Sequence, residues 1–582
     1  MVRVRPVLLS VVLLAALLAG CTGGKHDDSS SGTEATDVPA RDRAPGLPPA
    51  VELQPAATET PAAGTTPTPA PLVADPLAPG PLSTSRIAYD FGFTFAQDPG
   101  AVPPMYPVAV RGEVTVPDGP GPYPLILFMH GRHGTCAIAG LDLLGAYVCP
   151  NAVVITPVDS YTGYRPVADL LASHGYVVVS IDANHINERD QAVVVSTGGD
   201  YGALARGALT LLTATYFEGV NATGSAGSPT PQSIPDLQGR IDVSRIGLMG
   251  HSRGGEGVAR AVVLNNEAES PLPIKAVFAL APTDFAFWQP TRTALATLLP
   301  YCDGDVSNLQ GAWMYDDLHG VGDAGPLHQV VSMGANHNFY NSVWTGDDWG
   351  TRDDAWCDAK ARDAPAGQMT QGAAVMTSFF RMEVGGEAGF DPYWTGAVPF
   401  PDAACAQACA DRLLVSRFAT AERRADVSLD GQGATASSAV TGEACTFGGD
   451  ADADCHADSI GHADRLNVTW TGAGMLRFDV LEGAPTGLDA LTFRIAVAKA
   501  TGATLTVRLL DHDGHVALQQ AVDADRLTPA PGTAAHKLIL SQVRVPLGGL
   551  VVEDDVFAVE LAFTGSGELQ LADLAFQDED AA

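Results

Sequence analysis

The segment RIGLMGHSRGGEGVARAVVLNN, residues 245–266, decides the fold of the central part of the chain. Its first five residues, RIGLM, form an apolar run that predicts a strand. Its last thirteen residues, GGEGVARAVVLNN, are compatible with a helix. Between them, Gly250, Ser252 and Gly254 form the one G-x-S-x-G pattern in the sequence. A strand that turns sharply into a helix adopts strained backbone, and flanking glycines keep neighbouring side chains away. The segment therefore predicts a serine hydroxyl exposed at the carboxyl edge of a sheet.

Apolar runs alternate with helical stretches on both sides of this segment, from Arg86 to Pro401. Such alternation is typical of a protein built from βαβ units. Several of the runs lack alternating polar positions, as expected of parallel strands that are covered on both faces. The predicted strands are LILFMHG, YVVVSIDA, IGLMGHS, IKAVFALA and HQVVSMGANH, and the predicted helices are RPVADLLASHG, ALARGALTLLTATYF, MTQGAAVMTSFFRMEV and the run after Ser252.

A histidine and two aspartates follow the serine in the chain. A serine hydroxyl is a poor nucleophile until a base removes its proton, so a histidine and an orienting acid are required. His337 lies at the end of the last predicted strand, and Asp303 and Asp305 lie in the loop after TALATLLPYC. One of these aspartates should orient His337 and stabilise its imidazolium form. The sequence thus predicts a Ser-His-Asp triad with Ser252 as the nucleophile.

Two short motifs resemble those of a known group of enzymes. The string GHSRGG, residues 250–255, is similar to that of the chlorophyllases, and HGRHG, residues 130–134, resembles the oxyanion turn of α/β-hydrolases. Over residues 86–401 the chain resembles the serine esterases of the α/β-hydrolase superfamily, near the dienelactone hydrolases, chlorophyllases and platelet-activating-factor acetylhydrolases. The resemblance implies an α/β-hydrolase fold for this region, a mostly parallel sheet with helices on both faces.

The resemblance also implies roles for individual residues. In this superfamily the acid follows the serine and precedes the histidine, and it usually lies a few residues beyond its strand, before a small apolar residue. On this basis Asp305 is the preferred acid, and Asp303 is interpreted as a solvated turn residue. The oxyanion hole is expected to consist of the backbone N–H groups of Arg253 and Arg132, with His133 as the alternative to Arg132.

Other polar residues have more than one interpretation. Asp182, Asn184 and His185 follow a predicted strand at the same sheet edge, where they either line the substrate pocket or have structural roles. The acidic run at residues 450–454 begins like a calcium loop but lacks its turn glycine and closing glutamate. Cys455, His456 and His462 do not form a convincing zinc site. The sequence therefore predicts no metal ion and no cofactor.

The character of the sequence changes beyond Ala403. Short runs with alternating apolar and polar residues are separated there by Gly, Asp and Pro, which is typical of an antiparallel β-sandwich. Residues 402–582 are therefore predicted to form an all-β sandwich domain. Because no set of nucleophile, base and acid occurs there, this domain is expected either to hold or position a substrate or to pack against the hydrolase domain and stabilise it. The runs are LNVTW, MLRFDVL, LTFRIAV, LTVRLLD, HKLILSQVRVPL, VFAVELAF and LQLADLAF.

The first 20 residues have the layout of an export signal. Arg3 and Arg5 precede an apolar run, and the following LAGC resembles the lipobox of bacterial lipoproteins. This resemblance implies cleavage before Cys21 and lipid attachment at its thiol, and the alternative is an uncleaved anchor helix. The protein is predicted to be anchored to a bacterial membrane with its folded domains outside the cytoplasm. Residues 21–85 are rich in Pro, Thr and Ala and predict a disordered tether.

Cysteine usage is consistent with export. Of the nine cysteines, Cys21 is assigned to lipidation, and an even number remains. In an oxidising compartment such cysteines are first interpreted as disulfides. Three pairs are near in sequence, Cys136 with Cys149, Cys405 with Cys409, and Cys445 with Cys455. Cys302 and Cys357 are then left over as the fourth pair.

The charge narrows the range of functions. The formal net charge of −34, from 67 acidic and 33 basic residues, would repel nucleic acids and anionic membrane surfaces. Together with the triad, this predicts a secreted, lipid-anchored serine esterase that forms an acyl-enzyme on Ser252. Its ester substrate is expected to be small, polymeric or lipid. The alternatives are a non-catalytic binding lipoprotein on a hydrolase scaffold and a serine peptidase.

Overall fold

The structure, a computed structural model, describes the chain from Val73 to Glu579 with several gaps. Several predicted features lie outside the described residues: the predicted signal peptide with Cys21, most of the predicted tether, the acidic run at 450–454, Cys455 and His456. The described residues are 73–97, 104–138, 141–142, 149, 155–189, 200–227, 232–349, 357, 361–405, 408–429, 434–445, 458–480, 486–530 and 537–579.

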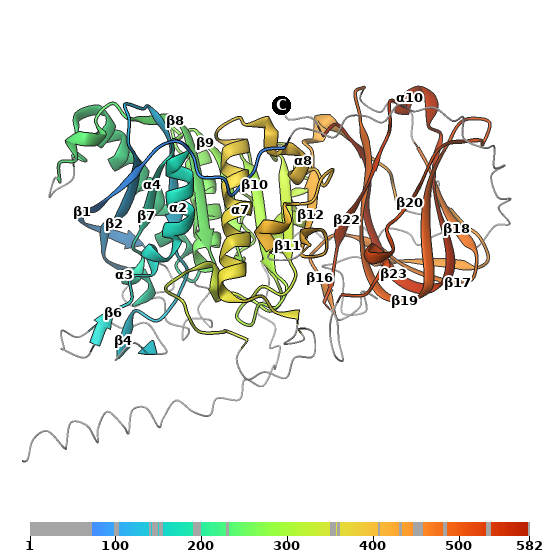
Figure 1. The fold of residues 1–582 in the computed structure, drawn as a ribbon, viewed down its shortest axis with the longest axis horizontal. Coiled ribbons are helices and arrows are strands. Elements are labelled where there is room, and N and C mark those ends of the chain that lie inside the picture. Colours follow the sequence, from blue (N-terminus) through green and yellow to red (C-terminus); the bar gives the residue numbers. More distant parts are fainter. Residues whose placement is uncertain are drawn as a thin grey trace, which may run out of the picture. The chain divides into compact units, whose positions relative to one another are not determined.

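A large mixed sheet of nine strands dominates the first part of the described chain (Figure 1). Its strand order is β1-β2-β7-β3-β8-β9-β10-β11-β12. The strands from β7 to β11 pair in parallel, whereas β1, β2 and β12 pair antiparallel at the two edges. The bounds are β1 Thr84–Gln97, β2 Met105–Pro117, β3 Tyr123–Met129, β7 Val177–Ile181, β8 Ile241–His251, β9 Ile274–Leu280, β10 Ala294–Pro300, β11 Leu327–Ser332 and β12 Leu413–Phe418.

Helices cover both faces of this sheet. Leu125 and Leu127 of β3 join the buried cluster of α4, α5 and α6, whereas Ile126 and Phe128 join that of α2 and α7. Because side chains alternate between the faces of a strand, each central strand contributes to both cores, which explains its continuous apolar sequence. The bounds are α2 Arg165–Ser173, α3 Asn184–Asn187, α4 Ala203–Thr223, α5 Arg253–Asn266, α6 Gly311–Leu318, α7 Pro365–Glu383, α8 Asp391–Trp394, α9 Asp402–Cys405 and α10 Val552–Asp555.

The second part of the described chain forms another sheet of nine strands, all antiparallel. Its two longest strands, β19 and β23, pair with each other along most of their length. Register shifts near Thr492, Val497 and Thr501 interrupt this pairing, and such bulges bend a strand. The bounds are β13 Arg424–Asp426, β14 Ala434–Ala436, β15 Val440–Cys445, β17 Arg465–Thr471, β18 Gly474–Asp479, β19 Ala490–Leu510, β20 Val516–Ala521, β22 Ser541–Pro546 and β23 Ala558–Gln577.

Two small sheets complete the described strands. One contains β4 (Cys136–Ile138), β5 (Leu141–Asp142) and β6 (Ile155–Pro157). The other pairs β16 (Ser459–Ile460) with β21 (Leu538–Ile539).

The predicted fold class, an α/β-hydrolase followed by a β-sandwich, is wrong. The first sheet is mixed, because β1, β2 and β12 pair antiparallel at its edges, and strands occupy more of the described residues than helices do. The second sheet is a nearly closed, barrel-like antiparallel sheet instead of two separate layers (Figure 1). The short runs LTFRIAV and LTVRLLD are the two ends of β19, and VFAVELAF and LQLADLAF are the two ends of β23. Alternation predicts each half-buried run, but it does not show that two runs belong to one bent strand.

The predicted boundaries also differ from the structure. Strand β12 lies beyond the boundary expected at Pro401, yet it pairs with β11 and completes the first sheet. At the other end, the described part of the predicted tether is attached to the folded chain. There Ala74 N–H donates to Gly389 O at 2.9 Å, and Leu82 N–H donates to Ser173 O at 3.1 Å.

Three predicted disulfides are confirmed among the described residues. Their Cα atoms lie 5.4–5.5 Å apart, within the usual range for disulfides. The pairs are Cys136–Cys149, Cys302–Cys357 and Cys405–Cys409. The fourth predicted pair involves Cys455, which lies outside the described residues.

Within the described ranges, no helix is both long enough and apolar enough to cross a membrane.

Candidate active site

Ser252 lies on a strained turn between β8 and α5. Its backbone has φ 57° and ψ −127°, a left-handed conformation that is costly for a residue with a side chain. The turn is held because Ser252 N–H donates to Leu280 O at 2.9 Å and Ser252 O accepts from Gly255 N–H at 2.8 Å. Unlike the exposed serine that the motif predicts, Ser252 is only 2% exposed.

The glycines of the motif are required by close backbone contacts. A Cβ atom on Gly250 would lie 2.0 Å from Gly254 O, and one on Gly254 would lie 2.3 Å from Met129 O. A Cβ on Gly131 would lie 2.5 Å from Ser252 Cβ and 3.2 Å from its Oγ. The predicted oxyanion loop therefore passes directly beside the serine side chain.

His337 is held by Asp303 rather than by Asp305. Its Nδ1 lies 2.8 Å from Asp303 Oδ2, and both side chains are buried. The other oxygen of Asp303 accepts the backbone N–H groups of Asp305 at 2.9 Å and Val306 at 2.6 Å. The Asp303 carboxylate is therefore oriented from both sides, as an orienting acid must be.

The preference for Asp305 over Asp303 thus needs correction. The Asp305 carboxylate lies 3.6 Å from Nε2 of His337, the nitrogen that faces away from Asp303, and its side chain is 64% exposed. The turn after β10 directs the first aspartate inward, where its oxygen accepts two backbone N–H groups, and leaves the second at the surface. The number of residues after the strand does not reveal which direction each side chain takes.

Asp348 joins the acid loop to the histidine loop. Its Oδ2 accepts Gly304 N–H at 2.8 Å, and its Oδ1 accepts Asn338 N–H at 3.0 Å. Gly304 lies next to Asp303, and Asn338 lies next to His337, so one carboxylate fixes the distance between the two loops. Burial raises the pKa of Asp348, and the neighbouring Asp303 adds to this effect, while His337 opposes it.

His251 connects the histidine loop to the serine turn. Its Nε2 lies 3.1 Å from His337 O, and its Nδ1 lies 3.0 Å from the Tyr164 hydroxyl. Because a carbonyl only accepts, Nε2 carries the proton and Nδ1 accepts from Tyr164. The rings of His251 and His337 are 4.9 Å apart, so the candidate base is packed against the residue that precedes Ser252.

The two histidines have opposite electrostatic environments. Burial lowers the pKa of His251 well below its ordinary value, and the neighbouring His337 lowers it further. Burial also lowers the pKa of His337, but Asp303, Asp305 and Asp348 outweigh burial and raise it to about 10. Among the described residues, Nε2 of His337 is buried and has no hydrogen-bond partner. His251 is therefore a neutral support, whereas His337 is the group that binds protons.

Aromatic residues surround Arg253, the residue after the serine. Its guanidinium lies over the rings of Tyr201 and Phe285, at 5.1 Å and 5.9 Å from their centroids. The Phe285 N–H donates to the buried carboxylate of Glu256 at 3.0 Å, which fixes this loop over the start of α5. Burial raises the pKa of Glu256 to about 7, although hydrogen bonds from Thr283 and the 285–286 backbone oppose the rise.

The remaining predicted pocket residues make structural contacts. Asp182 accepts Arg111 Nε at 2.8 Å, Asn184 Nδ2 donates to Val158 O at 2.9 Å, and His185 Nδ1 accepts Ala109 N–H at 3.0 Å. These contacts join β2, β7 and the loop that precedes α2, so the structural interpretation of all three residues is favoured.

His462 and the two histidines of the predicted oxyanion loop also have partners. His462 Nδ1 lies 3.1 Å from an Asp317 oxygen, and its ring stacks on Trp313. His130 Nε2 accepts Ala183 N–H at 2.8 Å, and the His133 ring stacks on Trp344 at 4.8 Å. No group of three or more His, Cys, Asp or Glu within the described ranges is arranged to hold a metal ion.

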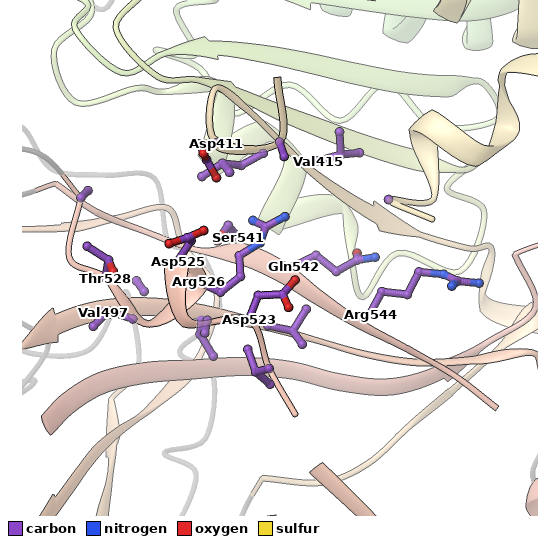
Figure 2. Close-up of a pocket in the computed structure, with 18 of the residues that line it drawn as sticks. Asp411, Val415, Val497, Asp523, Asp525, Arg526, Thr528, Ser541, Gln542 and Arg544 are labelled. Carbon is purple, nitrogen blue, oxygen red and sulfur yellow. The ribbon is translucent and has the colours of Figure 1, made fainter. Parts of the chain in front are cut away.

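A cavity of about 750 Å³ lies where the two sheets meet (Figure 2). Asp411, from the first part of the chain, faces Asp523, Asp525 and Arg526 from the second part. Among the described residues that line the cavity, none belongs to the Ser252, Asp303 and His337 set. This cavity is therefore separate from the candidate active site.

Sequence reasoning identified Ser252 and His337 but missed several supporting residues. His251 is the variable residue of the G-x-S-x-G pattern, Asp348 follows the histidine in an acidic loop, and Tyr164 precedes α2. The position of His251 beside the serine was the only available signal, since the roles of Tyr164 and Asp348 depend on contacts between segments far apart in sequence.

Comparison with known proteins does not assign the chain to a family. No protein-family model matches it, and a search of curated proteins finds no match.

Proposed function

We propose that this protein is a serine hydrolase that cleaves carboxylic esters, with Ser252 as the nucleophile, His337 as the general base and Asp303 as the orienting acid. The buried 2.8 Å contact between His337 Nδ1 and Asp303 Oδ2 carries this proposal. A carboxylate on Nδ1 fixes the ring so that Nε2 accepts the proton. The strained backbone of Ser252 and the close approach of Gly131 give further support.

In the acylation step, His337 Nε2 takes the proton of the Ser252 hydroxyl while Oγ attacks the ester carbonyl carbon. The carbonyl π bond opens, and its oxygen becomes negatively charged. The backbone N–H of Arg253, at the start of α5, and that of Arg132, next to Gly131, are the proposed donors to this oxyanion. The tetrahedral intermediate then expels the alcohol, which receives the proton from His337 and leaves an acyl group on Ser252.

In the deacylation step, water replaces the alcohol. His337 takes a proton from the water molecule while the water oxygen attacks the acyl carbon. The second tetrahedral intermediate then releases the carboxylic acid. The proton returns to Ser252 Oγ. Asp303 stabilises the imidazolium in both steps without itself changing protonation state.

The proposal predicts that Ser252→Ala loses several orders of magnitude in kcat, because triad members act as a unit. Purified protein that begins at Thr22, with an otherwise wild-type sequence, is expected to hydrolyse short-chain aryl esters and to react with a fluorophosphonate. Peptide mass spectrometry should locate the adduct on Ser252, with fluoride released. The measurements are initial rates over a series of acyl-chain lengths.

The reaction of wild type with the probe and its choice of substrate separate the proposed function from its alternatives. A folded wild-type protein that neither reacts with the probe nor cleaves any ester would favour a binding lipoprotein. Cleavage of peptides in preference to esters would favour a serine peptidase. Equal esterase activity of wild type and Ser252→Ala would indicate a contaminating enzyme.

We also propose that the protein is exported and carries a lipid on Cys21. The three disulfides support export, because disulfides persist in oxidising compartments. In cells fed a labelled fatty acid, wild type should incorporate the label and sediment with membranes. Cys21→Ala is expected to do neither, and a labelled Cys21→Ala protein would place the lipid elsewhere.

A further inference from the structure

Lys537, just before β21, reaches from the second part of the chain to the acid loop that follows β10. Its backbone N–H donates to the Tyr301 hydroxyl at 3.1 Å, and its Nζ donates to Tyr301 O at 2.9 Å. The ammonium group lies 5.7 Å from the centroid of the Tyr301 ring. Tyr301 follows β10 and precedes Asp303 by two residues. Lys537 is therefore hydrogen-bonded to the segment that carries the orienting acid.

Apolar packing reinforces this contact. Ile539 of β21 belongs to the buried cluster of Leu299, Tyr301 and Cys302. The same cluster contains Cys357, which forms a disulfide with Cys302. The acid loop is therefore held by β10, by the Cys302–Cys357 disulfide, and by the Lys537–Ile539 segment of the second part of the chain.

The charges near Lys537 are those of the active site. Lys537 is only 6% exposed. Burial lowers its pKa to about 7, while the Asp303 and Asp348 carboxylates oppose this change. Tyr301 is the other titratable group in contact with Lys537, and burial raises its pKa to about 12. Since both the ammonium and the neutral amine can donate, the bond to Tyr301 O persists on either side of this titration.

We propose that Lys537 is a positioning residue of the active site, through which the second part of the chain holds the Tyr301–Asp303 turn so that Asp303 meets Nδ1 of His337. This inference rests on the proposed function. It gives the second part of the chain a role in the hydrolysis of every substrate, including small soluble esters. A residue that only anchored one part of the chain to the other would change stability without changing the His337–Asp303 contact.

The test begins with Lys537→Met, which removes both the charge and the side-chain donor. The expected loss in kcat is on the order of tenfold to a hundredfold with KM nearly unchanged, because small misplacements of catalytic groups have effects of this size. Loosening Asp303 should also lower the pKa of His337, so the acid limb of the pH–rate profile should move to lower pH. Lys275→Met, at an exposed lysine, is the matched control and should match wild type.

A double-mutant cycle with Asp303→Asn identifies the route of the effect. If Lys537 acts through Asp303, Lys537→Met should cost little further kcat in the Asp303→Asn background. Additive losses, or an acid limb that stays in place or moves to higher pH, would overturn the inference. If circular dichroism shows that Lys537→Met does not fold, Lys537→Gln replaces it. This variant keeps a neutral donor to Tyr301 O, so its kcat is expected to be close to that of wild type. A large loss of kcat in folded Lys537→Gln with an unmoved acid limb would also overturn it.

Failure of this inference differs from failure of the proposed function. An inactive wild type that does not react with a fluorophosphonate contradicts the serine hydrolase itself. If wild type is active and Lys537→Met is folded and fully active, the proposed hydrolase function stands. Lys537 then has no positioning role in the active site.

Discussion

Asp303→Asn is expected to lower kcat by about 10⁴-fold, the size of effect seen when an amide replaces the acid of a serine hydrolase triad. The amide would present an NH₂ group or a weaker acceptor to Nδ1 of His337, so the ring would lose its orientation and its stabilised imidazolium. Asp303 is completely buried, and its other oxygen accepts two backbone N–H groups. Stopped assays with an aryl ester, together with melting curves, separate the loss of catalysis from any loss of stability.

Asp305→Asn is the matched comparison, since it makes the same chemical change two residues away. Asp305 raises the pKa of His337 through its charge, so removing that charge should lower this pKa. Neutral His337 would then be present at lower pH, and the acid limb of the pH–rate profile should move to lower pH with a small change in maximal kcat. The movement should shrink in high salt, because Asp305 is largely exposed. A large loss of kcat in Asp305→Asn together with a small loss in Asp303→Asn would assign Asp305, and not Asp303, as the orienting acid.

Arg494→Met is expected to lower the free energy of unfolding by about 3–5 kcal/mol, the usual cost of removing one partner from a buried ion pair. Arg494, on β19, donates to Asp316 of α6 and contacts Asp573 of β23, each at 2.6 Å. Burial lowers the pKa of Arg494, but these two carboxylates outweigh burial and raise it. The variant would leave both carboxylates buried without their cation. Urea unfolding at pH 7 measures the loss.

The pH dependence and an exposed pair provide controls. Unpaired buried carboxylates become protonated more readily, so the difference between Arg494→Met and wild type should narrow at acidic pH. Arg292→Met breaks a 3.1 Å pair with Asp323 in which both side chains are at least half exposed, and it should cost at most about 1 kcal/mol. Equal losses for the two variants would show that the buried pair has no special importance.

The same ion pair affects how the chain can be divided. Asp316 also accepts the backbone N–H groups of His462 and Ala463, both from the second part of the chain. The Arg417 N–H of β12 donates to Gln542 at 2.7 Å. A cut near Pro401 would remove β12 from the first sheet and leave Asp316 without these donors. The two sheets are therefore expected to unfold together.

Several features were predictable because they depend on local sequence. The apolar runs identified β3, β7, β8, β9 and β11, since a strand covered on both faces needs a continuous apolar sequence. The G-x-S-x-G pattern placed Ser252 between a strand and a helix, because only glycine fits the contacts at Gly250 and Gly254. The even number of cysteines and their nearness in sequence led to two of the three observed pairs, and Cys302–Cys357 was the pair left over.

Other features depend on contacts between distant segments and were decided only by the tertiary structure. The sequence by itself determined the strand-turn-helix around Ser252 and a histidine after a later strand. The direction of the turn after β10 selected Asp303 over Asp305, and the bends in β19 and β23 made one curved sheet out of runs that look separate. His251, Asp348 and Lys537 join the site through hydrogen bonds across up to 236 positions of sequence, and local periodicity contains no information about such distant partners.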